Sequence, residues 1–431
     1  MRVFVIGYGA REHALVWKLK KSPQVTDLFC APGNAGIADL ADCVPIEPSN
    51  VVELADFAEK INMDLTVVGP ELPLTLGIAD EFNRRNMKCF GPSRSAAEIE
   101  GSKIFSKEFM KNYNIPTGDF VTCSSMEEAS KILKKRKEYP VMIKADGLAA
   151  GKGAVKADSR DEAMEIADQC LQQKKFGMAG ERILIEEFLT GKEITFCVLT
   201  DGKRVQPLAT ARDFKPINDN NEGPNTGGMG SFSPARVLGA EMSATILKDI
   251  IYPTIRGLLQ ENRRYRGVLY AGLMLTDDGP KVLEYNARFG DPETQSILPR
   301  LDVDFVPVLL ATIKGRLDQY PLKWKKEVSL SVVVSAGGYP DSYETGTKIT
   351  GLDQAVKHDS VTVFHAGTKK DGDDTLVSGG RVLTVNATAP NLVKARELVY
   401  DTISRIQFDG MHFRKDIGIF DMPESLTEQD K

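Results

Sequence analysis

Two oxygen-bearing side chains at the end of a predicted strand could bind a metal ion. Glu284 and Asn286 are separated only by Tyr285, so strand alternation places both on one face. Magnesium prefers a few carboxylate or amide oxygens together with substrate phosphates and water. The pair therefore fits a metal ion bound to nucleotide phosphates. The alternative is a polar pair that only lines a solvated sheet face.

The turn after this strand gathers charge. Arg288, Asp291 and Glu293 follow closely, with Gly290 among them. A guanidinium and carboxylates beside a metal could compensate the charge of a transferring phosphoryl group. This context favours a chemical site over a solvated face.

A second candidate is the glycine-rich segment after the apolar strand that ends at Lys144. It contains Gly147, Gly151, Lys152 and Gly153. Glycines let backbone amides approach phosphates, but the P-loop spacing GxxxxGK[ST] is not met. Taken alone, the segment could be only a flexible connection. With Lys103 it becomes a candidate phosphate clamp.

An edge segment could bind the base and sugar of a nucleotide. Glu186, Glu187, Phe188 and Leu189 offer backbone groups for an adenine, and Glu193 offers a carboxylate for ribose hydroxyls. The alternative is an acidic, solvated strand edge.

The amino terminus contains an incomplete dinucleotide fingerprint. Gly7 and Gly9 begin the pattern, but Glu12 stands where GxGxxG needs glycine, and Cys30 closes the second strand without an acid. We therefore expect no NAD site. The turn could still hold an anionic substrate, because helix N-termini favour phosphate and Arg11 adds positive charge.

The pattern of strands and helices that would position these residues predicts a multidomain α/β and α+β protein. Through residue 101, short apolar runs alternate with helical patterns, which indicates a parallel sheet with crossover helices. Ligands of such sheets bind beyond the carboxyl ends of the strands, where Gly9, Asn34 and Glu71 lie.

Later segments predict further units. Residues 125–188 read as a small α+β module, and residues 193–208 and 268–286 as two hairpins. Residues 211–235 read as a long glycine-rich loop, a length that is usually functional or disordered. Residues 323–327 look like a linker before a last α+β domain.

Composition excludes several function classes. The chain has 431 residues, too many for one core, and a net charge of -5 that disfavours a nucleic-acid partner. The first apolar run is far too short for a signal peptide or a membrane span, so we expect a cytoplasmic protein. The scattered cysteines and histidines do not have zinc-ligand spacing.

Several motifs in order give a resemblance along nearly the whole chain. The chain resembles the glycinamide ribonucleotide synthetases, also called phosphoribosylamine-glycine ligases, of the ATP-grasp superfamily. The motifs are Gly7–Lys18, Val67–Pro73, Gly91–Lys103, Lys144–Gly153, Gly223–Met229, Ala287–Gln295, Gly337–Pro340 and Asp409–Gly418.

The resemblance implies an amino-terminal α/β domain over residues 1–101 and an ATP-grasp catalytic domain over 102–325 with an inserted lid at about 122–191. It also implies a carboxyl-terminal α+β domain over 326–424. The implied reaction joins glycine to 5-phosphoribosylamine through glycyl phosphate, using ATP and Mg²⁺ or Mn²⁺. No nucleic acid or membrane partner is expected, and the protein is expected to be a monomer or weak homodimer.

The resemblance also implies roles for residues. Arg288, Asp213 and Asp291 would be catalytic, and Glu284 and Asn286 would bind the metal. ATP would contact Lys103, Lys144, Gly151, Lys152, Gly153, Glu186, Glu187, Phe188, Leu189 and Glu193, and the other substrates Gly9, Arg11, Asn34, Glu71, Gly290 and Glu293.

The sequence departs from the family pattern in a few places. Ala10 and Ala287 stand where members commonly have glycine and cysteine, and Ala271–Leu275 offers no first metal-binding acid. The rivals are another ATP-grasp ligase, a catalytically silent nucleotide-binding protein, and an oxidoreductase. The GPNTGGM and ARFGDPETQ segments argue against the first, and the retained charged residues against the second.

Overall fold

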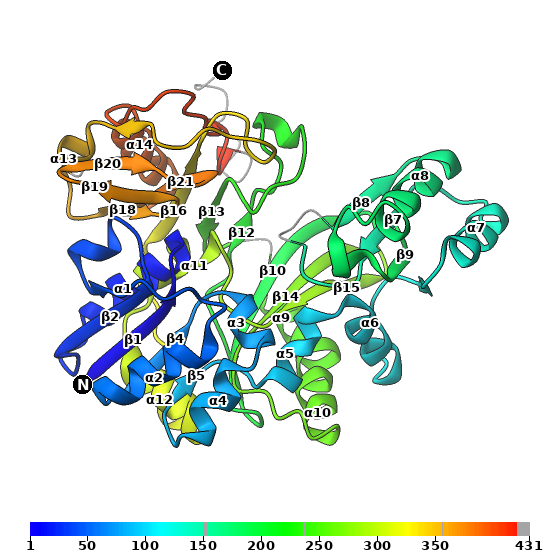
Figure 1. Ribbon diagram of the computed structural model, residues 1–431, viewed down its shortest axis with the longest axis horizontal. Helices are drawn as coiled ribbons and strands as arrows, with labels where there is room; N and C mark the ends of the chain where they lie inside the picture. Colours follow the sequence, from blue (N-terminus) through cyan, green and yellow to red (C-terminus); the bar gives the residue numbers. More distant parts are fainter. Residues whose placement is uncertain (150–152, 236–237, 356, 420–431) are drawn as a thin grey trace.

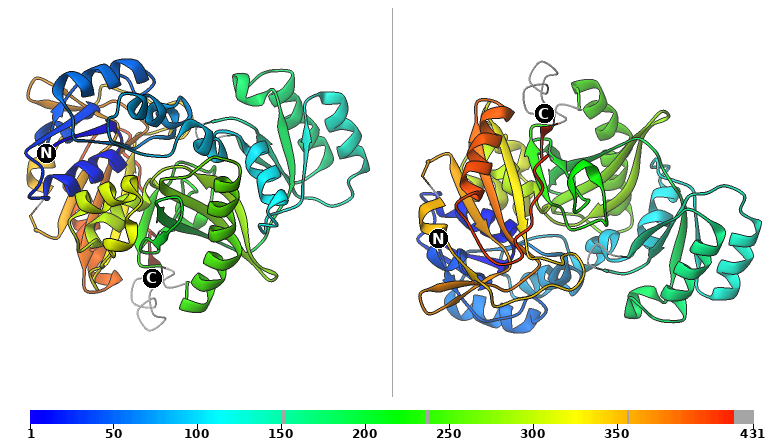
Figure 2. Two further views of the ribbon diagram at one scale, coloured as in Figure 1. Left: turned by 90° about the horizontal axis from the view of Figure 1, so that it is seen from below. Right: turned by 90° about the horizontal axis from the view of Figure 1, so that it is seen from above.

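The chain folds into four parts in the computed structural model, which describes residues 1–149, 153–235, 238–355 and 357–419. The amino-terminal and carboxyl-terminal parts lie on one side of a central sheet. A smaller module projects on the other side (Figure 1). Figure 2 shows the same separation from two further directions.

The amino-terminal part is a parallel sheet in the order β3-β2-β1-β4-β5. Its strands are β1 (Arg2–Gly7), β2 (Asp27–Pro32), β3 (Asp42–Cys43), β4 (Leu65–Val68) and β5 (Cys89–Phe90). Its helices are α1 (Ala10–Lys20), α2 (Val51–Ile61), α3 (Glu71–Thr75), α4 (Ile78–Arg84) and α5 (Arg94–Gly101). The expected parallel sheet is confirmed.

The projecting part is an antiparallel sheet in the order β6-β9-β7-β8 with two covering helices. Its elements are β6 (Phe120–Cys123), α7 (Met126–Lys135), β7 (Val141–Ala145), β8 (Ala154–Ala157), α8 (Arg160–Leu171) and β9 (Ile183–Glu187). We call residues 120–187 the projecting module. Helix α6 (Lys103–Asn112) precedes it, and the Ser102 side chain accepts a hydrogen bond from the Phe105 amide at its start.

The central sheet has the order β11-β10-β14-β15 and is antiparallel. Its strands are β10 (Lys192–Thr200), β11 (Val205–Pro207), β14 (Gly267–Thr276) and β15 (Gly279–Asn286). The helical segment before β14 contains α9 (Ala240–Ile246), the π-helical stretch Leu247–Ile251 and α10 (Tyr252–Gln260). Helices α11 (Glu293–Ile297) and α12 (Phe305–Lys314) follow β15.

The carboxyl-terminal sheet takes two strands from the segment that the sequence predicted to be a loop. Its order is β12-β13-β16-β21-β18, and β12 (Arg212–Asp213) and β13 (Gly230–Ser233) come from residues 211–235. The other strands are β16 (Val328–Ser335), β18 (Val361–His365) and β21 (Arg381–Ala389). Short strands carry little hydrophobic periodicity, so these two are revealed by the pairing of β12 with β13 and of β13 with the distant β16.

The rest of this part is small. A three-stranded sheet contains β17 (Lys348–Ile349), β20 (Asp374–Val377) and β19 (Thr368–Asp371), and the helices are α13 (Leu352–Ala355) and α14 (Leu392–Ile403). The expected mixture of parallel-sheet and α+β parts is confirmed.

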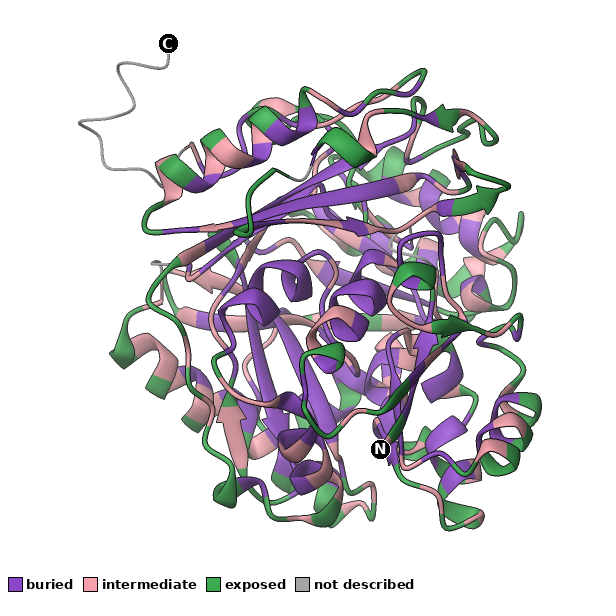
Figure 3. Ribbon diagram, turned by 90° about the vertical axis from the view of Figure 1, so that its left-hand side faces the viewer, coloured by how far each residue is buried: buried purple, intermediate pink, exposed green. Residues whose placement is uncertain are grey.

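Buried side chains run continuously between the parts. One apolar cluster joins Leu15 of α1 and Val67 of β4 to Leu199 of β10 and Leu309 of α12. The projecting module has a separate cluster, which includes Leu133, Ile143 and Ile185. Figure 3 shows the buried strands beneath half-exposed helices. No helix among the described residues is long and apolar enough to cross a membrane.

Candidate active site

Glu284 lies on β15, and positively charged side chains surround it. Burial raises the pKa of this carboxyl, but Lys215, Lys144, Lys103 and Arg288 lower it by more, so the net shift is downward. The carboxylate is therefore charged, in a place where several cations converge from different elements.

The neighbouring strand adds no acid at this point. Gly272 of β14 pairs with Glu284, and a Cβ at Gly272 would meet the Glu284 Cγ at 3.4 Å. The segment that lacked an acid in the sequence therefore does face Glu284. No group of three or more His, Cys, Asp or Glu side chains in the described part of the chain is arranged to hold a metal. The donors present fit a metal whose other ligands are phosphates and water.

Asn286 and Arg288 lie together. The Arg288 guanidinium donates to Asn286 Oδ1 at 3.1 Å and to Glu71 Oε2 at 3.1 Å, and it lies 3.3 Å from Glu100 Oε1. Burial lowers the pKa of Arg288, but Glu100 and Glu71 raise it overall. The predicted residues Glu71, Asn286 and Arg288 are thus in one network.

Glu100 was not singled out from the sequence. It is buried at the end of α5 and accepts the Ala287 amide at 2.6 Å. Burial raises the pKa of Glu100 to about 7, although Arg288 pulls it down. By contrast, Arg288 and Arg11 outweigh burial and lower the pKa of Glu71 to about 2. The two carboxylates beside Arg288 therefore titrate very differently.

The lysines lie on one wall of the site. Lys144 Nζ is 2.5 Å from Glu186 Oε2 and donates to the Leu283 carbonyl at 3.3 Å. Lys107 forms an ion pair with the same Glu186 carboxylate. Lys103 Nζ donates to the Gly147 carbonyl at 3.0 Å, and burial lowers its pKa. The Glu186 side chain therefore contacts two lysines. One of them, Lys107, was not predicted from the sequence to belong to the site.

The other predicted nucleotide contacts lie along the adjoining edge. Asp119 and Glu187 exchange hydrogen bonds, Leu189 is buried, and Lys156 Nζ lies 5.3 Å from the Phe188 ring centroid. Glu193 forms an ion pair with Lys215. Burial lowers the pKa of Lys215, but Glu193, Glu284 and Asp213 raise it overall.

The glycine-rich segment is only partly described. Gly153 accepts a hydrogen bond from the Ala145 amide at 2.7 Å, which places it beside the end of β7. The predicted contacts Gly151 and Lys152 lie outside the described residues.

Two acidic side chains face a buried region beside the central sheet. Glu293 is buried and accepts from the Thr195 hydroxyl at 3.0 Å, while a Cβ at Gly290 would meet Glu293 Oε2 at 2.5 Å. Asp213 Oδ1 is buried without a hydrogen-bond partner. Burial and then the charge of Glu293 raise the pKa of Asp213 well above its usual range.

Asp291 connects the site to the carboxyl-terminal sheet. Its carboxylate lies 2.9 Å from the Arg381 guanidinium and accepts from Gln295 Nε2 at 2.8 Å. Arg381 also donates to the Gly227 carbonyl at 2.6 Å. Arg381 comes from β21, far from the motif in sequence, and was not predicted.

The amino-terminal turn contacts the same region. Gly9 donates its amide to Glu12 Oε2 at 2.7 Å, and Arg11 donates to Glu12 at 2.5 Å and to the Phe289 carbonyl at 3.2 Å. A Cβ at Gly69 would lie 2.0 Å from Glu12 Oε1. Glu12 therefore occupies the space between the glycine turns, which explains why the dinucleotide pattern breaks there.

Asn34 lies close to this turn but is fully hydrogen-bonded. Its Nδ2 donates to the Tyr8 and His365 carbonyls at 2.7 Å each, and its Oδ1 accepts from the Gly36 and Ile37 amides. The side chain thus joins the amino-terminal turn to β18.

The missed residues share one property. Glu100, Lys107, Lys215 and Arg381 each form an ion pair with a site residue of another segment, namely Arg288, Glu186, Glu193 and Asp291 respectively. The feature that marks these four residues is a charged side chain that is buried or partly buried. Burial cannot be determined from one sequence.

The fold and the site define the class. The projecting antiparallel module, the central sheet with Glu284 and the two flanking parts are those of an ATP-grasp ligase, a class that uses ATP and a divalent metal ion. The biotin carboxylase of Campylobacter jejuni has the same fold, with a TM-score of 0.72 at 14% identity, covering 100% of this chain and 96% of that one.

The chain belongs to the phosphoribosylglycinamide synthetase family. The family's N domain matches residues 1–100, its ATP-grasp (A) domain residues 101–294 and its C domain residues 329–419. The phosphoribosylamine–glycine ligase of Halalkalibacterium halodurans is 46% identical over the full length of both chains. The crystal structure of the ligase of that name from Thermotoga maritima has a TM-score of 0.84 at 33% identity, covering 97% of this chain and 100% of that one. The expected family is confirmed.

Proposed function

We propose that this protein joins glycine to 5-phosphoribosylamine, using ATP, to give glycinamide ribonucleotide, ADP and phosphate in purine biosynthesis. The observation that carries the proposal is the convergence of Lys103, Lys144, Lys215 and Arg288 on Glu284. These charges suit a nucleotide triphosphate and its metal, and family membership supplies the other substrates.

The proposed reaction has two steps. A glycine carboxylate oxygen attacks the γ-phosphorus of ATP, and the bond to the ADP oxygen breaks, which leaves glycyl phosphate. The amine nitrogen of phosphoribosylamine then attacks the glycyl carbonyl carbon, loses a proton, and phosphate departs. In this scheme Arg288 compensates the charge on the transferring phosphoryl group and orients the glycine carboxylate.

Glu284 and Asn286 would hold the metal, Mg²⁺ or Mn²⁺. When bound, the metal neutralises charge on the phosphates and aligns the γ-phosphoryl group. Asn286 Oδ1 already accepts a hydrogen bond from Arg288, which orients the amide that would hold the metal.

The proposed ATP contacts lie on the side of the site that contains the lysines. Lys103, Lys144 and the segment from Gly151 through Lys152 to Gly153 would contact phosphates. The backbone from Glu186 through Glu187 and Phe188 to Leu189 would contact adenine, and Glu193 the ribose. The support is that Lys103, Lys144 and Lys215 already meet carboxylates or carbonyls around one space.

The acids beside the central sheet would handle the glycine amine. Asp213 has a buried oxygen without a hydrogen-bond partner, and Glu293 is the neighbour that raises its pKa. An ammonium group between them would supply the missing donor and neutralise the repulsion. Gly290 leaves room there, and Asp291 is proposed to assist the second amine.

Phosphoribosylamine would lie at the amino-terminal turn. The proposed contacts are the turn at Gly9, the guanidinium of Arg11 and the region of Asn34 and Glu71. Arg11 and Glu71 are already connected to the site through Phe289 and Arg288. The proposal keeps the cytoplasmic setting and the monomer or weak homodimer expected from the sequence.

The decisive test measures phosphate release from ATP by the intact protein. We expect release only when glycine, phosphoribosylamine and a divalent metal are all present. Equal release without glycine would show that glycine is not the acyl donor and would overturn the proposal.

A second test addresses the metal. Glu284→Gln should lower turnover by at least about a hundredfold, because removal of one preorganised charge in such a site commonly costs that much. Glu241→Gln is the matched control, because it removes an exposed carboxylate of α9 that has no proposed role, and it should retain most activity. An active Glu284→Gln enzyme with the wild-type melting temperature would show that the metal lies elsewhere.

A further inference from the structure

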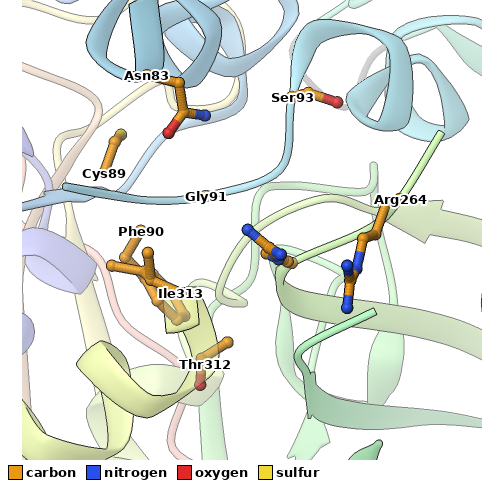
Figure 4. A pocket seen from close by; sticks show the side chains of 9 residues that line it. Asn83, Cys89, Phe90, Gly91, Ser93, Arg264, Thr312 and Ile313 are labelled. Atoms are coloured by element: carbon orange, nitrogen blue, oxygen red, sulfur yellow. The ribbon is translucent and has the colours of Figure 1, made fainter. Parts of the chain in front are cut away.

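A small pocket lies away from Glu284, where β5, α4, α12 and the start of β14 meet. Its volume is about 160 Å³, and its lining includes Asn83, Ser93, Arg264, Arg266 and Thr312. In Figure 4, Asn83 and Ser93 lie on one side, Thr312 on the opposite side and Arg264 on a third. Three regions of the chain thus enclose one space.

Two guanidinium groups reach this pocket without an anionic partner. Neither Arg264 nor Arg266 forms a side-chain hydrogen bond or an ion pair with any residue that the structure describes. The Nε of Arg266 is buried and lacks a hydrogen-bond partner. Such an unsatisfied charged donor costs free energy, so its presence needs an explanation.

Asp201, the acid whose charge acts on Arg266, does not explain the unsatisfied guanidinium. Asp201 acts on the charge of Arg266, but its carboxylate already accepts the amides of Lys203, Arg204 and Leu317 and the Arg204 guanidinium. Burial, and then the positive charge of Arg264, lowers the pKa of Arg266. The pair therefore remains a local excess of positive charge.

We propose that this pocket is a binding site for a phosphate group, held between the guanidiniums of Arg264 and Arg266. Arginine forks match phosphate oxygens in geometry and in charge. Ser93 and Asn83 add polar groups at the rim. The volume is below the ~300 Å³ of common small-molecule sites, so the pocket suits orthophosphate or the terminal phosphate of a small ester.

Isothermal titration of the intact protein with orthophosphate, at fixed ionic strength and with saturating MgADP, tests the site. We expect Arg266→Gln to weaken phosphate binding at least about tenfold, because it removes a charged donor. Arg264→Gln should weaken it too. Arg264 is exposed, so that variant keeps the test valid even if Arg266→Gln fails to fold.

The matched control is Arg256→Gln, which removes an exposed arginine of α10 outside the pocket and should bind phosphate like the wild type. Ribose 5-phosphate in place of orthophosphate distinguishes an ester from the free ion. Tighter binding of the ester that Arg266→Gln abolishes would support the site with an ester as its occupant. Wild-type affinity in both pocket variants, or an equal loss in Arg256→Gln, would overturn the proposal.

Discussion

Asp213 shows how burial and a neighbouring charge can prepare a residue for a ligand. Its Oδ1 has no hydrogen-bond partner, and a Cβ on Gly228 would approach that oxygen to 2.7 Å. A carboxyl in such surroundings resists ionisation until a cation arrives. An incoming ammonium group would therefore bind and ionise it together.

Asp213→Asn should raise the KM for glycine by about thirtyfold to a hundredfold, because a buried charged hydrogen bond contributes roughly 2 to 3 kcal/mol. The KM for ATP should change little. Steady-state phosphate release with each substrate varied in turn measures both constants. Equal increases in the two KM values would contradict a specific role in glycine binding.

Arg381 extends the site to another element. It contacts Asp291 and the Gly227 carbonyl, so it fixes the glycine-rich loop beside the charged turn. Arg381→Met should lower kcat/KM by about tenfold to a hundredfold, since each charged contact contributes about 1.5 to 3 kcal/mol.

Arg405→Met is the control for that variant, because Arg405 pairs with Asp401 on α14 and has no proposed role in the site. We expect it to keep wild-type kinetics. An Arg381→Met enzyme with unchanged kcat/KM would show that the contact between Arg381 and Asp291 does not position the turn.

Between elements, a histidine pair joins α1 to β18. The His365 amide donates to His13 Nδ1 at 2.9 Å, and a Cβ on Gly36 would lie 2.5 Å from both imidazole rings. Burial lowers the pKa of His13 to about 3 and that of His365 to about 4. Both rings are therefore neutral where the amino-terminal and carboxyl-terminal parts meet.

This contact predicts a loss of stability in acid. The unfolded chain binds a proton at each histidine near pH 6.5 and the folded chain only near pH 3 or 4, so stability falls as pH decreases through that window. At pH 5 the buried His13 alone would lower the free energy of unfolding by up to about 2 kcal/mol.

The measurement is the unfolding midpoint in urea at pH 7.5 and at pH 5. His13→Gln should show a smaller decrease between these pH values than the wild type, and exposed His358→Gln should show the full decrease. An unchanged decrease in His13→Gln would mean that other groups govern acid sensitivity.

The sequence predicted elements well where periodicity was strong. The parallel strands before residue 91 and the β14–β15 hairpin lie where expected. It did not predict β12 and β13, because strands this short are defined by their pairing, of β12 with β13 and of β13 with β16.

At the scale of the whole molecule, the projecting module stands apart from the other parts, with a hydrophobic cluster of its own. Its links to the central sheet include the hydrogen bond from the Lys144 ammonium to the Leu283 carbonyl. Parts with small interfaces are expected to move relative to one another. We expect ATP to draw this module toward the central sheet.

Small-angle scattering measures that motion. The radius of gyration should decrease when ATP and Mg²⁺ are added, since closure would bring the projecting module nearer the centre of mass. In Lys144→Met, which lacks a proposed phosphate contact, the decrease should be smaller or absent. An identical radius with and without nucleotide in the wild type would contradict closure.

The candidate site was predictable only in part, because some of its residues meet only when the parts of the molecule pack together. Glu284, Arg288 and the lysines Lys103 and Lys144 stand in sequence motifs and meet in space as expected. Glu100 and Arg381 come from the two flanking parts, and their closeness to Arg288 and Asp291 depends on how those parts pack. Packing between distant segments leaves no periodic signal in one sequence.

The strand β13 has a consequence for how the chain can be divided. It hydrogen-bonds to β16 and follows directly on the Gly227–Met229 stretch beside the site. A fragment that begins at residue 326 would lack this strand and expose an unpaired sheet edge, which is prone to aggregation. Co-expression of two halves split near residue 326 would therefore require strand complementation in trans. Because of the same pairing, we expect the carboxyl-terminal part and the glycine-rich loop to unfold as one cooperative unit.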